Sequence, residues 1–146
     1  MKKWLLFSLV LSCSFLFADS IGYIDSQLIL KQYNKALAAQ SELANKQKDF
    51  QDTLVKKQAE LETARAELKD DAFQELKEKM EKELQPKRDE VLILNQQFAT
   101  EIEQDIMTAA KKIARQLRVD VVLDKQVVIL GGMDLTSLVL SKLNNN

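Results

Sequence analysis

Apolar side chains recur along the middle of this chain at the spacing of a long amphipathic helix. From Ser26, which can cap a helix, to about Lys69 no Gly or Pro interrupts the sequence, and one stripe repeats every seven positions. Glutamine and alanine dilute the stripe, so it predicts a helix whose contact with a partner helix is thin. Its members are Tyr33, Gln40, Gln47, Leu54, Leu61 and Leu68, with Leu37, Leu43, Ala44 and Phe50 at neighbouring positions.

A second helical pattern runs from Ala72 to Leu117. The interruption before it, Lys69-Asp70-Asp71-Ala72, is rich in aspartate, which favours turns and helix starts. We therefore expect the chain to reverse near residues 69–73 and to return antiparallel. The later apolar positions approach an 11-residue period, which indicates a contact that does not supercoil uniformly. The apolar positions are Phe73, Leu76, Met80, Leu84, Val91, Leu94, Phe98, Ile102, Ile106, Ala109, Ile113 and Leu117.

Pro86 lies inside the returning helix, where proline removes a backbone donor and crowds the preceding turn. A reversal at Pro86 itself would leave arms of 60 and 31 residues, whereas a reversal near residue 70 leaves 44 and 46. The nearly equal lengths favour the symmetrical hairpin with its ends level. Pro86 is then expected to kink the arm and to let it flex.

Short strands are predicted at the two ends of the hairpin. In Ile21–Asp25 the period of two places Ile21 and Tyr23 on one face and Ile24 on the other, and Val119–Asp124 is β-branched. Val127–Leu130 follows after two residues, which predicts a second strand joined by a tight turn. Asp134 is expected to cap a final helix, Leu135–Leu143, with one apolar face. The fold class is therefore mainly α with a small β body: residues 19–25 and 118–146 form the body and residues 26–117 the hairpin arm.

The predicted β body is too small to be stable alone. Three short strands and one helix bury little apolar surface, and unpaired strand edges invite further pairing. Several copies that close through their strands would solve both problems and leave the hairpins projecting. The residues expected in this oligomerisation body are Ile21, Tyr23, Ile24, Val121, Leu123, Val128 and Leu130.

The first residues are typical of a secretory signal peptide. Lys2 and Lys3 give a positive start, and Trp4–Phe17 form an uncharged, mainly apolar run. This run is shorter than the roughly 20 residues of a membrane span. Ala18 is a small residue before the expected cut, so we predict export with cleavage near Ala18. Leu16 is large for its place before the cut and leaves the exact position open.

Cys13 is the single cysteine and lies inside this segment. Val10-Leu11-Ser12-Cys13 loosely resembles a lipoprotein box, so a lipid-anchored surface module is an alternative. The apolar run continues past Cys13, which favours a small residue in a signal core. Cleavage after Ala18 removes the thiol, and disulfides and thiol catalysis are then excluded.

Charge and composition argue against nucleic-acid binding and catalysis. Loss of Lys2 and Lys3 reduces 21 basic residues to 19, against 22 acidic ones, so the exported chain carries −3. We expect no nucleic-acid partner, since that needs a clustered basic surface. The chain has no histidine, and Gly131-Gly132 is not a phosphate loop. Carboxylate pairs such as Asp70/Asp71 fit a solvated helix surface. No catalytic residue, metal site or cofactor is predicted, and we expect a protein that is not an enzyme.

Phe73 and Met80 near the expected tip have two interpretations. Methionine adapts to varied shapes, so the two side chains could form a soft contact surface for a partner. They also fall on the seven-residue spacing, which slightly favours packing that closes the hairpin near its end.

Taken together, this layout resembles the Skp/OmpH family of periplasmic chaperones. The resemblance covers nearly the whole exported chain and is specific mainly at its ends, while the arms match in length and composition. The segments that carry it are Ile21-Gly22-Tyr23-Ile24-Asp25 with Leu30 and Tyr33, Val121-Val122-Leu123-Asp124, and Val127–Leu130 followed by Asp134-Leu135-Thr136 and the terminal helix.

The resemblance implies a homotrimer with a small β body and three long arms around a cavity. It implies an ATP-independent holdase that keeps unfolded outer-membrane proteins soluble in the periplasm until insertion. Many weak contacts inside one cage would retain a client without any single strong site. Phe73 and Met80 are then the candidate client contacts.

One departure from the family concerns charge. Its well-studied members are basic, with positive arms that suit acidic lipids, whereas residues 65–90 here carry seven basic and nine acidic residues. A phosphate-binding tip is therefore not carried over, and only weak contact with a membrane surface is expected. The alternative function is a coiled-coil adaptor of the envelope that binds one folded partner.

Overall fold

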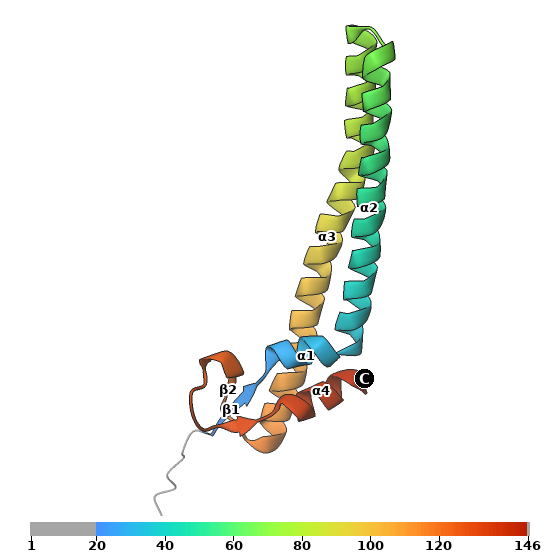
Figure 1. Cartoon of the computed structure of the whole chain (residues 1–146). Helices are drawn as coiled ribbons and strands as arrows, with labels where there is room; N and C mark the ends of the chain where they lie inside the picture. Colours follow the sequence, from blue (N-terminus) through green and yellow to red (C-terminus); the bar gives the residue numbers. More distant parts are fainter. Residues whose placement is uncertain (1–19, 146) are drawn as a thin grey trace, which may run out of the picture.

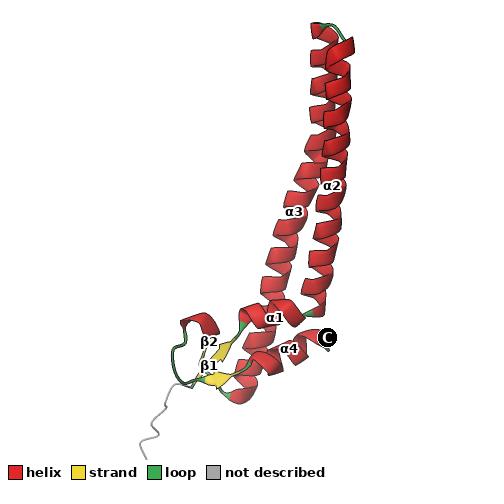
Figure 2. Ribbon diagram, viewed as in Figure 1, coloured by secondary structure: helices red, strands yellow, loops and turns green. Residues whose placement is uncertain are grey.

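A long two-helix hairpin stands on a small body of short helices and strands (Figures 1 and 2). The computed structural model describes residues 20–145. The predicted leader at residues 1–18, with cleavage near Ala18 and lipidation of Cys13, lies outside these residues. The predicted fold class, mainly α with a hairpin arm and a small β body, is confirmed.

The arm consists of α2 (Asn34–Glu67) and α3 (Asp70–Leu117). The chain reverses at Leu68 and Lys69, between the two helices. α3 begins two residues before the predicted start because Asp70 and Asp71 occupy its first turn, where carboxylates stabilise the N-terminus of a helix. The helix continues through Pro86, and flexing at that residue stays a prediction.

The contact line between α2 and α3 keeps the predicted seven-residue spacing, and the predicted column contributes Tyr33, Leu54 and Leu61, which are buried or half-buried. Gln40 and Gln47 are exposed. Leu43 and Phe50 are half-buried instead, because their side chains remove more apolar surface from water. On α3 the buried and half-buried positions recur every 11 residues, as the sequence indicated. The α2 column is Ala36, Leu43, Phe50, Lys57 and Ala64, and the main α3 column is Met80, Val91, Ile102 and Ile113.

The predicted single helix from Ser26 to Lys69 is wrong, because it is two helices. α1 (Ser26–Gln32) is capped by Asp25, whose carboxylate accepts a hydrogen bond from the Leu28 amide at 2.9 Å. Tyr33 then adopts an extended conformation with φ −78° and ψ 117°, and α2 starts at the next residue. The two arm helices are consequently not level: α3 extends past the base of α2 into the body (Figure 1).

The sheet has the order β2-β1-β3, and both pairings are parallel. β1 (Ile21–Ile24) lies between β2 (Val121–Asp124) and β3 (Met133–Asp134). Two strands that flank β1 in parallel cannot be joined by a tight turn, because that connection makes an antiparallel pair.

The predicted strand at Val127–Leu130 is therefore wrong, and its residues belong to the connection between β2 and β3. A short 3-10 helix, η1 (Lys125–Val127), starts this connection. The Asp124 carboxylate accepts a hydrogen bond from the Gln126 amide at 2.9 Å. Gly131 and Gly132, with φ of 82° and 87°, bring the chain back to the sheet in a conformation that glycine adopts at low cost.

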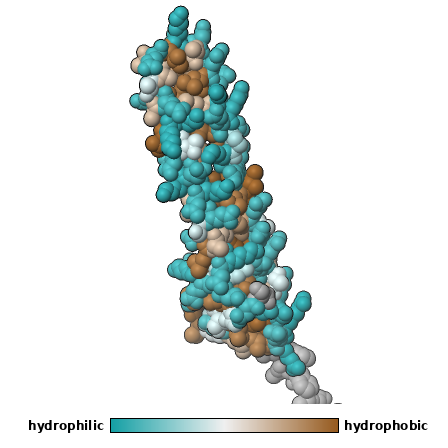
Figure 3. Space-filling view, turned by 90° about the vertical axis from the view of Figure 1, so that its right-hand side faces the viewer, coloured by the Kyte–Doolittle hydropathy of each residue, from teal (hydrophilic) through white to brown (hydrophobic). Residues whose placement is uncertain are grey.

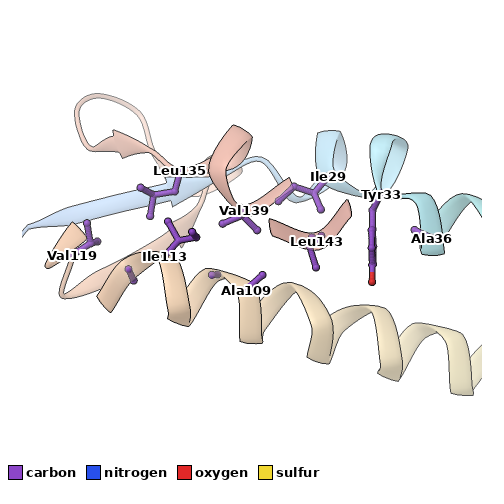
Figure 4. Packing of buried hydrophobic residues seen from close by; sticks show 11 residues of the cluster. Ile29, Tyr33, Ala36, Ala109, Ile113, Val119, Leu135, Val139 and Leu143 are labelled. Atoms are coloured by element: carbon purple, nitrogen blue, oxygen red, sulfur yellow. The ribbon is translucent and has the colours of Figure 1, made fainter. Parts of the chain in front are cut away.

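The hydrophobic core lies between the sheet, α1, the body end of α3 and the last helix, α4 (Thr136–Asn144) (Figure 4). Ile29, Leu135 and Val139 are fully buried. Asp134 accepts a hydrogen bond from the Thr136 amide at 2.9 Å, so the predicted cap residue does bond to the start of this helix. The other buried members are Tyr33, Ala36, Ala109, Ala110, Ile113, Ala114, Val119 and Leu143.

Asn144 at the end of α4 bridges the break between α1 and α2. Its Oδ1 accepts a hydrogen bond from the Asn34 amide at 2.9 Å, and its Nδ2 donates to the Gln32 carbonyl at 3.0 Å. One side chain thus satisfies a carbonyl at the end of α1 and an amide at the start of α2, which lack helical partners. The C-terminal helix thereby fixes the direction in which the arm leaves the body.

A second polar contact ties the root of α2 to α3. The Tyr33 hydroxyl donates to Asp105 Oδ2 at 2.9 Å, and Lys35 Nζ lies 2.8 Å from Asp105 and 3.1 Å from Glu101. The ammonium of Lys35 is the main cause that lowers the pKa of Asp105, and the Tyr33 hydroxyl lowers it further. Burial, followed by the Asp105 carboxylate, raises the pKa of the Tyr33 hydroxyl.

Replacement of Asn144 by Ala is expected to loosen the root of the arm. The change removes both bridging hydrogen bonds, and we expect it to lower the free energy of unfolding by about 1–2 kcal/mol. It should also speed hydrogen exchange at the Asn34 amide. The matched control is Asn145→Ala, since the Asn145 side chain bonds only to Ser141 in its own helix, at 3.1 Å. Equal protection of the Asn34 amide in the two variants would contradict the bridging role.

The Asp105 contact predicts a loss of stability in acid. Because the folded state lowers the pKa of Asp105 below its ordinary 3.8, this group stabilises the fold above that pH. The contribution is lost as the pH falls through the folded pKa. We expect the thermal midpoint of wild-type protein to fall more steeply between about pH 5 and about pH 2 than that of Asp105→Asn. Asp52→Asn, at an exposed position of α2, is the control and should keep the wild-type slope.

Candidate functional site

One face of the sheet carries apolar side chains that the described residues leave largely uncovered. The parallel register pairs Ile21 with Val121 and Tyr23 with Leu123, so these four side chains share a face. Ile21, Val121 and Leu123 are 46%, 44% and 37% exposed, and Tyr23 is half-buried. We call these four residues the sheet-face patch.

The other residues predicted for the oligomerisation body lie elsewhere. Ile24 points to the opposite face of the sheet and packs against the hydrophobic core. Val128 is half-buried, whereas Leu130 is 94% exposed in the connection between β2 and β3. The structure therefore brings together four of the seven predicted residues and separates three.

The opposite face of the sheet explains why a glycine stands in β1. A Cβ atom at Gly22 would lie 2.8 Å from Leu135 Cδ1 and 3.1 Å from Val119 Cγ1. Only a residue without a side chain allows β1 to approach the core this closely. The glycine thus fixes which face of the sheet is covered and which face stays open.

The arm carries an apolar groove of about 510 Å³ between α2 and α3. Met80 is only 3% exposed and forms part of its floor, whereas Phe73, closer to the tip, is half-buried and does not line it. Along the arm, apolar surface is divided into separate patches by hydrophilic side chains (Figure 3). The apolar lining is Phe50, Leu54, Leu61, Met80 and Leu84, and the polar lining is Lys57, Gln58, Lys77, Glu81, Gln85 and Arg88.

Ion pairs across the arm fix the register of its two helices. Lys46 Nζ lies 2.6 Å from Glu90, Lys57 Nζ lies 2.9 Å from Glu83, and Lys87 Nζ lies 2.7 Å from Asp49. The carboxylates raise the pKa of Lys46 and Lys57, and their lysine partners lower the pKa of Asp49 and Glu83. Exposed pairs of this kind stabilise little individually, so they select the register more than they hold the arm together.

The part of the chain that the structure describes, residues 20–145, offers neither a metal site nor a membrane span. Within it no group of His, Cys, Asp and Glu side chains is arranged to hold a metal ion. None of its helices combines the length and the hydrophobicity needed to cross a bilayer.

Comparison with known proteins connects this architecture to one family. The model of the OmpH family, described as outer membrane protein (OmpH-like), matches residues 20–143. A search of curated protein sequences gave no significant match. Among solved structures, a candidate outer membrane chaperone (OmpH-like) from Caulobacter crescentus is similar in fold, with a TM-score of 0.56 and 17% sequence identity. The match covers 86% of this chain and 84% of the Caulobacter chain. The chain therefore belongs to the OmpH-like family.

Proposed function

We propose that this protein is an ATP-independent holdase that keeps unfolded outer-membrane proteins soluble in the periplasm until insertion. The observation that carries the proposal is the open arm, a long hairpin whose thin helix contact leaves an apolar groove between charged rims. A wide, shallow apolar surface of this kind suits flexible clients of varied sequence. The predicted leader at residues 1–18 would bring the chain to the periplasm.

The sheet-face patch supports assembly as a homotrimer. Three adjacent side chains of this patch are more than one-third exposed, and three side chains of the whole body are fully buried. A protomer this poor in buried apolar volume gains stability when copies cover its open sheet face. Closed threefold symmetry would give every protomer the same interface and place three arms around one cavity.

Retention inside such a cavity needs no nucleotide and no single strong site. A client enclosed by three arms meets many weak contacts at high effective concentration. Phe73 and Met80 remain the proposed client contacts, and a client would reach Met80 through the groove because Met80 is buried. Flexing of α3 at Pro86 would adjust the width of the cavity to the client.

Light scattering on the exported form of the chain tests the proposal directly. We expect the mass of three protomers for the protein alone. With an unfolded outer-membrane barrel protein and no nucleotide, we expect a soluble complex of three protomers and one client. A monomer or dimer that does not prevent aggregation of the unfolded barrel protein would contradict the proposed holdase function. Stable binding of one folded envelope protein instead would support the adaptor.

Substitution of Leu123 by Lys tests the role of the sheet-face patch. Leu123 is exposed in the protomer, so the change should leave the fold intact and place a charge in the interface. We expect the dissociation constant of the trimer to rise by at least about tenfold. The circular dichroism spectrum should not change. The control is Leu92→Lys on the arm, at a residue that is 56% exposed. A Leu123→Lys protein as trimeric as the control would exclude this face as the interface.

A further inference from the structure

The side of α3 that faces away from α2 carries apolar side chains that the hairpin does not bury. In the middle of α3 the half-buried apolar positions are Val91, Leu94 and Phe98. Leu92 and Ile93 lie between these positions and are 56% and 54% exposed. An α-helix turns by about 100° per residue, so these two side chains project away from the contact with α2. The fold of the protomer therefore gains little from them.

Leu92 and Ile93 belong to the longest uncharged stretch of the two arm helices. No Asp, Glu, Lys or Arg occurs from Val91 to Thr100. Within this stretch Gln96 and Thr100 are exposed and follow Leu92 at intervals of four residues, which places the three side chains on one side of the helix. We call Leu92, Ile93, Gln96 and Thr100 the neutral α3 face.

Ion pairs neutralise most of the acidic groups that border this face. Its nearest charged neighbours in the sequence are Arg88, Asp89 and Glu90 on one side and Glu101 and Glu103 on the other. Three of these carboxylates lie close to a cation: Asp89 is 3.7 Å from Arg88 Nε, Glu90 is 2.6 Å from Lys46 Nζ and Glu101 is 3.1 Å from Lys35 Nζ. A charged group placed on the face would lose water and gain no counter-charge, so the face favours an uncharged partner.

The spacing of side chains along the face matches that of an extended polypeptide. Residues four apart in an α-helix are separated by a rise of about 6 Å. Every second side chain of an extended chain points to the same side, at intervals of about 6.6 Å. An extended segment lying along α3 can therefore place alternate side chains against Leu92, Gln96 and Thr100 in succession. The amide of Gln96 and the hydroxyl of Thr100 both donate and accept hydrogen bonds, so they can bond to the backbone of such a segment.

The neutral α3 face lies on the part of the arm between the groove and the body. The groove is lined on α3 by residues from Lys77 to Arg88. On the body side, Met107 follows Thr100 by seven residues and is 49% exposed. Met107 also lines a hollow of about 440 Å³ together with Leu123 of the sheet-face patch. In the proposed trimer the neutral α3 face would therefore lie near the closed end of the cavity.

We propose that the neutral α3 face binds extended, uncharged segments of the client in which apolar side chains alternate with polar ones. The inference rests on the proposed holdase function and adds to it the chemistry of the bound segment. Strands of outer-membrane barrels alternate in this way. A neighbouring arm is a poorer occupant, because residues 34–105 carry 12 basic and 17 acidic residues and two such arms repel each other.

Peptide binding tests this proposal on the chain from Asp19 onward. The probe is a fluorescent, uncharged twelve-residue peptide in which valine, leucine and tyrosine alternate with serine, threonine and glutamine. We expect the double variant Leu92→Gln, Ile93→Gln to raise its dissociation constant at least about fivefold, because the apolar contact is lost. The matched control, Val55→Gln with Leu68→Gln, removes side chains that are 54% and 42% exposed elsewhere on the arm. This control should bind the peptide as tightly as the wild type.

A polarity-sensitive dye reports the contact directly, since the chain from Asp19 onward contains no cysteine. The emission of a dye on Gln96→Cys should shift to shorter wavelength when the peptide binds. The same dye on Gln51→Cys, at an exposed position of α2, should not respond. A shift at Gln96→Cys that accompanies trimer assembly without peptide would assign the face to a second copy and overturn the proposal.

The remaining outcomes separate this inference from the holdase function. Equal binding by the wild type and Leu92→Gln, Ile93→Gln, or equal weakening in both double variants with unchanged circular dichroism, would overturn the role of the face. Equally tight binding of a peptide whose polar positions carry aspartate and lysine would overturn the preference for uncharged segments. If the wild type and the Leu92→Gln, Ile93→Gln variant keep an unfolded outer-membrane barrel protein soluble equally well, this inference fails and the holdase function stands. If the wild type itself does not, the holdase function fails.

Discussion

The parallel pairing of β1 with strands from the far end of the chain is the contact on which the rest of the structure depends. The Ser20 amide donates to the Asp120 carboxylate at 3.0 Å across 100 positions of sequence, and β1 then fits between β2 and β3. Closure of a flexible loop of this length costs about 4 kcal/mol. The hairpin reduces that cost because its helices form locally and reverse once, at Leu68 and Lys69. The arm is thus both the client-facing part of the proposal and the scaffold that assembles the body.

Local signals in the sequence were sufficient for the elements whose structure is decided locally. Alternation predicted β1, and the spacing of apolar residues predicted two long helices with their reversal within a few residues of its observed place. The break at Tyr33 could not be found in this way, because the side chain that satisfies it, Asn144, lies more than 100 residues away in the sequence. Likewise the β-branched run Val127–Leu130 has the composition of a strand. Its neighbours in space decide otherwise, since parallel strands on both sides of β1 require a long connection.

The candidate surfaces also include a part that local sequence predicted and a part that depends on distant contacts. The period-2 pattern correctly placed Ile21 and Tyr23 on one face, and the register then added Val121 and Leu123. The same alternation places Ile24 on the core side of the sheet. The sequence does not show which face of the sheet α3 and α4 cover, so it could not separate the apolar strand residues of the interface from those of the core. The groove could not be predicted either, because the column of α2 that meets α3 is set by packing and by ion pairs such as Lys57 with Glu83.

Net charge was the least informative quantity, because it averages over a molecule longer than the distance at which charges act. The exported chain of −3 is not uniformly charged: residues 34–105 carry −5, residues 20–33 together with 106–145 carry +3, and Asp19 carries −1. In an assembly whose protomers pack through their sheet faces, the acidic surfaces of neighbouring arms would repel one another. The apolar sheet-face patches would hold the body ends together. In the proposed trimer, this repulsion would act against closure of the cavity. The thin, polar contact between α2 and α3 leaves apolar surface on the arm that the proposed client could reach, and the acidic surfaces of neighbouring arms would keep these apolar surfaces from packing against one another.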